Sequence, residues 1–223
     1  YTAEVIRRCA PRLKVISKWG TGIDSIDKEA AEAIGIQVFR TLNAFTVPVS
    51  DSVMGYILAF ARCQPWMDDD VKAGNWSKIP GRALSECTLG VIGVGFIGKE
   101  VLRKAHAFGM KLLANDIVEV SHDFLGQYPV KMVSLAELLA EADFISVNCD
   151  LNPTSYHLLD HQAFALMKPT AVVINTARGS IIDEGALVEA LRQGLIAGAA
   201  LDVFEVEPLP KNSPLRSMKN VML

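Results

Sequence analysis

Residues 88–108 read TLGVIGVGFIGKEVLRKAHAF, and this stretch decides the fold. An apolar strand pattern runs into a Gly-x-Gly-x-x-Gly turn, and the turn runs into a helical pattern. Gly93 permits the tight turn, Gly95 lets the backbone approach a pyrophosphate, and Gly98 lets the helix pack close to the strand. An anion there would face free amides and the positive end of the helix dipole. The stretch predicts a dinucleotide site, and the alternative is a glycine-rich turn without a ligand.

Asp116 supports the dinucleotide interpretation because it directly follows the next apolar run, Lys111–Asn115. A carboxylate at the end of the second strand accepts hydrogen bonds from the adenosine ribose hydroxyls and repels a 2′-phosphate. The residues after it, Ile117, Val118 and Glu119, include no cation that would receive such a phosphate. We therefore expect NAD(H) rather than NADP(H), and the alternative is a simple loop carboxylate.

Short apolar runs alternate with amphipathic stretches along the rest of the chain, which is typical of a parallel sheet with crossover helices. Helix-start signals agree with this pattern. Ser25 is predicted to cap a helix over residues 26–34, and Ser134, Asp160 and Asp183 are predicted to cap later ones. The runs predicted to be strands are Leu13–Ser17, Gln37–Phe39, Thr88–Ile92, Lys111–Asn115, Phe144–Asn148, Ala171–Asn175 and Ala199–Phe204.

Composition excludes several other classes of protein. The 22 basic and 25 acidic residues are well mixed and give a net charge of −3. The overall charge therefore gives no reason to expect binding to nucleic acid or to an anionic membrane surface. The longest stretch without a charged residue, Cys87–Gly98, is too short to span a bilayer. The four cysteines lie far apart without a CxxC pair, so we expect no metal site, no disulfide framework and a reducing, cytoplasmic location.

Polar strings follow three of the predicted strands in the second half of the chain. In an open α/β sheet ligands bind at this carboxyl edge. At this edge, Arg178 could bind a carboxylate through two parallel hydrogen bonds, or it could be a structural arginine paired with an acidic residue. Glu207 offers a carboxylate at the same edge, but it could be an exposed loop residue, and Glu205 is a rival for its role. The three strings are Asn148–Asp150, Asn175–Gly179 and Asp202–Pro208.

These motifs resemble the NAD-dependent D-isomer-specific 2-hydroxyacid dehydrogenases, with the D-3-phosphoglycerate dehydrogenase branch most similar. The resemblance implies a Rossmann-type doubly wound parallel sheet plus part of a smaller flavodoxin-like α/β substrate domain, with the active site between them. It assigns residues 1–45 to the partial substrate domain, 46–82 to a linking and dimerisation helix and loop, and 83–223 to the NAD-binding domain. The matching segments are Trp19–Asp24, Ile26–Asp27, Thr46–Asp51, Gly93–Gly98, Met167–Pro169, Asn175–Gly179, Asp183–Glu184 and Ala199–Pro208.

The resemblance also implies roles for single residues. Arg178 matches the substrate-orienting arginine, and Glu207, just before Pro208, matches the catalytic glutamate in preference to Glu205. The implied ligand of the substrate loop is a small 2-hydroxy or 2-keto acid, whose carboxylate would meet Lys18, Trp19 and Gly20. The implied NAD contacts are Gly93, Gly95, Phe96, Ile97, Gly98, Asp116, Asn148, Thr154, Thr176, Ala177 and Asp202.

One part of the family pattern is not matched. The family's acid–base histidine, which pairs with the glutamate, lies in a Pro-His pair shortly after the strand that here begins at Asn220. The chain opens at Tyr1 and closes at Leu223, and we expect it to be cut at both ends. We therefore expect these residues alone to bind NAD but to reduce 2-keto acids very poorly. The histidines that do not match are His106, His122, His157 and His161.

The leading hypothesis is thus an oxidoreductase for a small D-2-hydroxy acid, with 3-phosphoglycerate as one candidate substrate. The alternatives are an NAD-sensing, corepressor-like binding protein and a glyoxylate, formate or phosphite dehydrogenase on the same scaffold. Arg178 and Glu207 favour an enzyme, and Lys18 is a candidate phosphate ligand without being diagnostic. The apolar 47–62 helix predicts a homodimer, although it could instead be a core helix of one copy.

Overall fold

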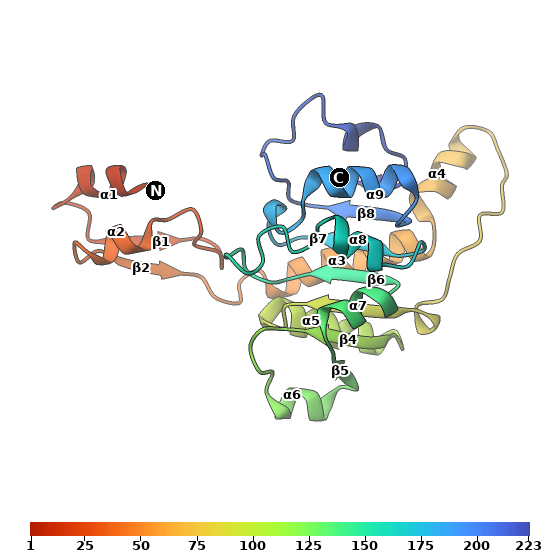
Figure 1. Cartoon of the computed structure of the whole chain (residues 1–223), viewed down its shortest axis with the longest axis horizontal. Helices are drawn as coiled ribbons and strands as arrows, with labels where there is room; N and C mark the ends of the chain where they lie inside the picture. Colours follow the sequence, from red (N-terminus) through yellow and green to blue (C-terminus); the bar gives the residue numbers. More distant parts are fainter. The chain divides into compact units, whose positions relative to one another are not determined.

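The computed structural model describes all 223 residues and divides them into two compact units, Tyr1–Pro48 and Val49–Leu223. The first unit pairs two parallel strands and packs two helices with them around a small core that includes Ile6 and Ile16 (Figure 1). It is an α/β unit, as the sequence predicts. Its elements are α1 (Ala3–Cys9), β1 (Val15–Lys18), α2 (Lys28–Glu32) and β2 (Gln37–Arg40).

The second unit is built on a sheet of seven parallel strands in the order β5-β4-β3-β6-β7-β8-β9. The chain enters the sheet at β3, moves outward through β4 and β5, and then returns to build the other half from β6 to β9. The prediction of a Rossmann-type doubly wound sheet is confirmed. The strands are β3 (Thr88–Ile92), β4 (Lys111–Asn115), β5 (Val130–Met132), β6 (Phe144–Val147), β7 (Val172–Asn175), β8 (Gly198–Leu201) and β9 (Val221–Met222).

Helices cover both faces of this sheet (Figure 1). Successive side chains of β7 point to opposite faces of the sheet. Val172 and Ile174 pack with α3 and α5 on one face, whereas Val173 packs with α7, α8 and α9 on the other. Because the central strands β3, β6, β7 and β8 are covered on both sides, their apolar runs are continuous rather than alternating. The helices of this unit are α3 (Thr46–Ala61, which begins at the end of the first unit), α4 (Gln64–Lys72), α5 (Phe96–Ala107), α6 (His122–Gln127), α7 (Leu135–Glu141), α8 (His161–Leu166) and α9 (Glu184–Gln193).

The helix caps show where local signals succeed and where they fail. The side chains of Ser134, Asp160 and Asp183 cap α7, α8 and α9 as predicted. The predicted cap at Ser25 is wrong: Asp27 caps the shorter α2 and accepts the N–H of Ala30 at 2.9 Å. The reason is tertiary, because Ile26 is buried in the core of its unit and holds the chain out of the helix until residue 28.

Several short elements were not predicted, among them α4, β5 and α6. The segment after α3 is polar, yet it forms α4, in which Lys72 pairs with Asp68 one turn earlier. Strand β5 is three residues long and pairs only with β4, and α6 is six residues long. Both are too short for their hydrophobic periodicity to be recognised in the sequence. No helix of the structure has the length and apolar character that a membrane crossing requires, and no group of three or more potential metal ligands comes together.

The amino edge of the sheet is held by Asp143, which is almost fully buried at the start of β6. Its carboxylate accepts the N–H of Thr88 at 2.8 Å and lies 3.1 Å from Arg82 Nη1 and 3.3 Å from Lys168 Nζ. Burial alone would raise the pKa of Asp143, but the Thr88 amide and the two cations outweigh it and lower the pKa. The ionised carboxylate thus joins three segments of the chain on the side away from the predicted site.

Candidate dinucleotide and substrate-acid site

The glycine-rich turn lies between β3 and α5, beside β6, where the strand order of the sheet reverses. Gly93 has a φ of +90°, and a Cβ on it would lie 2.5 Å from the backbone nitrogen of Cys149. A Cβ on Gly98 would lie 2.0 Å from the carbonyl oxygen of Gly93. These two glycines are therefore required by the fold itself.

Gly95 differs, since a Cβ on it would meet nothing within 4 Å. It is the N-cap of α5, and no side chain caps the helix there, so the first turn, with Phe96 and Ile97, begins beside open space. A helix N-terminus with this exposure is suited to a phosphate. Of the three glycines in this turn, only Gly95 is not needed for the protein's own packing, and it is the one where a pyrophosphate would approach.

Asp116 follows β4 and connects two loops. Its carboxylate accepts the N–H of Val94 at 2.6 Å and the N–H of Val118 at 2.9 Å. Both carboxylate oxygens are thereby fixed beside the glycine-rich turn, and each keeps a lone pair that a ribose hydroxyl could reach. The side chain thus serves the fold, which was the alternative interpretation, and its position also fits the predicted ribose contact.

The segment after β6 closes the other side of the turn. The side-chain nitrogen of Asn148 donates to Ser146, but its Oδ1 atom is buried and has no hydrogen-bond partner. Thr154 is held by Asn152, whose Oδ1 accepts both its N–H (2.8 Å) and its hydroxyl (2.6 Å). An orphaned acceptor at the switch point and the open space at Gly95 are what a bound dinucleotide would be expected to complete.

Burial raises the pKa of the Cys149 thiol to about 11, and the negative charges of Asp150 and Asp116 add to the effect. The cysteine at the switch point therefore stays protonated at neutral pH and does not provide a nucleophile.

The loop after β7 presents Arg178. Asn175, buried at the end of the strand, donates to the carbonyl oxygen of Arg178 at 2.9 Å and accepts the N–H of Ala177 at 3.0 Å. These two bonds shape the turn that contains Thr176. Sequence reasoning gave Asn175 no role, although an Asn directly before a turn is a recognisable signal for a side chain that bonds its own backbone.

Gly179 brings this loop against the loop after β8. A Cβ on Gly179 would lie 1.9 Å from the carbonyl carbon of Phe204, so only glycine allows the approach. The N–H of Asp202 also donates to the carbonyl oxygen of Asn175 at 3.0 Å. Segments that carry the predicted arginine and the predicted glutamate are therefore in direct contact.

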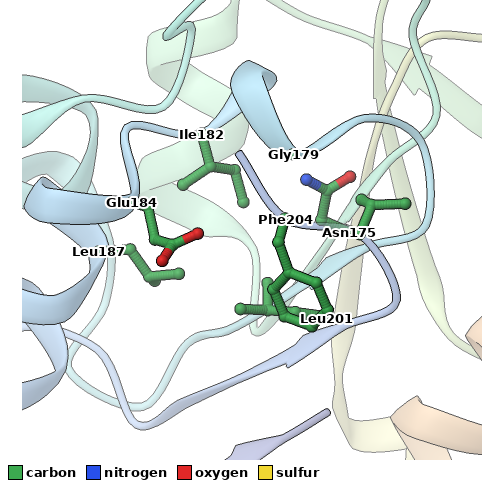
Figure 2. Close-up of a pocket in the computed structure, with 8 residues that line it drawn as sticks. Asn175, Gly179, Ile182, Glu184, Leu187, Leu201 and Phe204 are labelled. Atoms are coloured by element: carbon green, nitrogen blue, oxygen red, sulfur yellow. The ribbon is translucent and has the colours of Figure 1, made fainter. Parts of the chain in front are cut away.

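Glu207 lies in the exposed part of the second loop, and its Oε1 accepts the N–H of Phe204 at 3.1 Å. Under the two loops, α9 and the strand ends surround a small, solvent-open pocket (Figure 2). The carboxylate of Glu184 lies among the apolar side chains there, and burial and then the charge of Glu205 raise its pKa, against one backbone hydrogen bond from Glu205.

The residues predicted to meet the substrate carboxylate lie in the first unit. Lys18 ends β1, and its Nζ lies 3.4 Å from Ser25 Oγ. The Trp19 ring is 82% exposed and lies against Phe45, with a centroid distance of 5.7 Å. Gly20 has a φ of +148°, which favours glycine. The three residues form one exposed loop, and their contact with a substrate stays a prediction.

Seven parallel strands in this order, with a glycine-rich turn at the switch point, define a dinucleotide-binding domain. Residues 54–223 match the family described as "D-isomer specific 2-hydroxyacid dehydrogenase, NAD binding domain". The chain belongs to this family of NAD-dependent dehydrogenases, which act on small 2-hydroxy and 2-keto acids, and the predictions of the family and of NAD as cofactor are confirmed.

The chain is similar to several named relatives. It is 42% identical over 224 residues to a D-3-phosphoglycerate dehydrogenase of Methanocaldococcus jannaschii, covering 99% of this chain and 42% of that protein. It is 37% identical over 227 residues to a glyoxylate reductase of Korarchaeum cryptofilum, covering 99% of this chain and 68% of that one. The D-lactate dehydrogenase of Aquifex aeolicus, solved with NAD and lactic acid, matches with a TM-score of 0.86 and 35% identity, over 92% of this chain and 61% of that one.

Proposed function

We propose that this chain carries the NAD-binding domain, and part of the substrate domain, of an enzyme that transfers a hydride between NAD(H) and a small D-2-hydroxy or 2-keto acid. The contact of Gly179 with Phe204 carries the proposal, because it joins the loop of Arg178 to the loop of Glu207 at the carboxyl edge of the sheet. A protein that only sensed NAD would need neither side chain, so the two together favour an enzyme over a corepressor-like sensor.

The proposed chemistry divides between the two loops. Bound NAD supplies the hydride acceptor or donor. Arg178 would hold the substrate carboxylate in bidentate fashion and stabilise charge on the reacting oxygen. Glu207 would orient a histidine and favour its charged form, so that the imidazole gives a proton in reduction and takes one in oxidation. The resemblance assigns that histidine to a Pro-His pair after the strand that begins near Asn220.

For the substrate we propose a small acid of the D-3-phosphoglycerate type, with the Lys18–Gly20 loop as the anion-binding part of the first unit. Lys18 contacts the neutral hydroxyl of Ser25, which leaves its charge available for a phosphate. Glyoxylate, formate and phosphite are the competing substrates, and they differ in having a single acid group with no separate phosphate for Lys18 to bind. The chain spans 42% of the phosphoglycerate dehydrogenase and 68% of the glyoxylate reductase described above, and both names support a hydroxyacid substrate.

We also propose a homodimer formed through the 47–62 helix region and a cytoplasmic location. The four cysteines are all free, which fits a reducing compartment. Helix α3 buries Val53, Met54 and Ile57 within its own unit, so these side chains need no partner, whereas Val47 is 56% exposed. Light scattering on the full-length protein tests the proposal: a mass of two chains supports the dimer, and a mass of one chain contradicts it.

The function is tested with the full-length protein, NADH and a panel of acids that includes glyoxylate, pyruvate and 3-phosphohydroxypyruvate. We expect NADH oxidation with at least one of them. Arg178→Lys should lower kcat/KM about 100-fold, because a point charge replaces a bidentate fork, and should leave NADH affinity unchanged. Arg192→Lys, at the exposed end of α9, is the matched control and should have no effect.

Two results would contradict the proposal. Tight NADH binding without oxidation by any acid of the panel would favour the sensor. A residue other than histidine after the predicted proline, found by reading the encoding gene past the codon for Leu223, would remove the proposed proton donor.

A further inference from the structure

His157 lies in the segment between β6 and α8 and makes a contact that the proposed reaction does not use. Its Nε2 lies 2.5 Å from Glu205 Oε1, and its Nδ1 lies 3.8 Å from Asp183 Oδ2. Tyr156 stacks on the imidazole with a centroid distance of 4.0 Å and an interplanar angle of 14°. About 30% of each of the His157 and Glu205 side chains is exposed, so the contact is partly shielded from solvent.

The backbone holds His157 in place independently of this contact. Its N–H donates to the carbonyl oxygen of Ser180 at 2.9 Å, in the turn directly after Gly179. Its φ is +49°, in the left-handed region, which His and Asn adopt more readily than most residues. The backbone of His157 is thus fixed beside the loop that follows Arg178, and this places the imidazole next to that loop.

Glu205 is held at two atoms. Its side chain meets His157, and its backbone N–H points to Glu184 Oε2 at 3.4 Å, on the first residue of α9. Glu207 lies two residues further along the same loop, and its carboxylate is tied to the N–H of Phe204. Contacts that fix Glu205 therefore restrain the loop backbone from which the Glu207 side chain extends.

We propose that His157 is a positioning residue, whose contact with Glu205 fixes the loop that presents Glu207. This inference rests on the proposed function, in which Glu207 orients the acid–base histidine. It agrees with the resemblance, which matched Glu207 rather than its rival Glu205 to the catalytic glutamate: Glu205 is directed at His157, which leaves Glu207 for the reaction. Removing the contact leaves the glycine-rich turn and Asp116 untouched, so it should loosen the substrate side of the site more than the dinucleotide side.

The test uses three variants of the full-length protein. His157→Asn keeps a residue that tolerates the left-handed backbone but is too short to reach Glu205, and Glu205→Gln removes the charge. His161→Asn is the matched control: His161 also faces a glutamate, Glu189, at 3.4 Å, but both side chains are about 60% exposed, and such surface pairs contribute little.

Amide hydrogen exchange, measured without any substrate, reports directly how often the backbone of this loop opens. We expect faster exchange in the peptide 202–209 for His157→Asn and Glu205→Gln, with no change for His161→Asn. We also expect kcat to fall about 10- to 100-fold, with NADH affinity changed less than twofold, because a small displacement of a reacting group costs about this much. The double variant should lose little more than either single one, because the two residues act through one contact.

Unchanged exchange in His157→Asn would overturn the inference, and so would single-variant losses that multiply in the double variant. The exchange result is independent of turnover. If the wild-type protein oxidises NADH with no acid of the panel, the proposed function fails, and the exchange still decides whether His157 holds the loop. His157→Gln, whose amide can reach Glu205, should restore part of kcat, and no recovery would count against the contact.

Discussion

Gly179→Ala is the perturbation whose consequence follows most directly from the structure. The new Cβ would lie 1.9 Å from the carbonyl carbon of Phe204, 2.0 Å from its oxygen and 2.4 Å from the nitrogen of Glu205. All three are backbone atoms, so no flexible side chain can move aside. Ordinary contact begins at 3.4 Å, so the loops must separate by about 1.5 Å.

This displacement sets the expected magnitudes. A shift of about 1 Å at a reacting group costs about 100-fold in rate, so kcat should fall by at least that factor. Overpacking of this kind costs about 1–3 kcal/mol, and for a chain of this size each kcal/mol lowers Tm by about 2–4 °C. NADH affinity should fall less than kcat, because the glycine-rich turn and Asp116 lie outside the two displaced loops, although the implied NAD contacts Thr176, Ala177 and Asp202 lie on them.

The assay compares Gly179→Ala with Gly126→Ala in the full-length protein. Gly126 lies in α6, and a Cβ on it would meet nothing within 4 Å, so its variant should match the wild type. Thermal unfolding, NADH titration and turnover are measured for both. A Gly179→Ala protein with wild-type Tm and wild-type kcat would refute the argument that the two loops are in backbone contact.

Three further outcomes follow from the structure. Gly95→Ala should lower Tm by no more than about 4 °C yet weaken NADH binding at least 10-fold in a fluorescence titration, because the added Cβ meets no protein atom within 4 Å and lies where a pyrophosphate would approach. Asp116→Ala should weaken NADH binding about 5- to 100-fold, since it loses the ribose contact and releases Val94 and Val118, and an unchanged Kd would contradict this. Asp143 has a pKa lowered by folding, so its stabilising effect is complete above the unfolded pKa of about 3.9 and is lost as the pH falls through the folded value. Denaturant titrations between pH 3 and pH 7 should therefore show an acid-side loss of stability that Asp143→Asn reduces, and identical pH profiles would exclude the assignment.

Much of the larger unit was predictable because its signals are local. The strand, glycine-rich turn and helix of residues 88–108 are contiguous, and the caps at Ser134, Asp160 and Asp183 act within one helical turn. The alternation of strands and helices predicts a parallel sheet, and the resemblance to the family implied its doubly wound order. Residues with such short-range causes can be read from sequence alone.

What could not be predicted depends on contacts between distant segments. His157 and Glu205 are 48 positions apart, and neither has a neighbour in sequence that points to the other. The Gly179–Phe204 contact is likewise visible only once β7 and β8 lie side by side. Ile26 shortens α2 for the same reason, since its burial is decided by the core of its unit. The roles of Arg178 and Glu207 remain predictions that the proposed experiments test.

The close approach of Gly179 to Phe204 also bears on how substrate preference can be redesigned. Because the backbones of the two loops touch, neither can change shape without the other. A graft that transplants only residues 175–179 from a relative would meet a mismatched surface at residues 202–207. The two loops therefore form one unit of exchange, and a chimera should be built by moving both together.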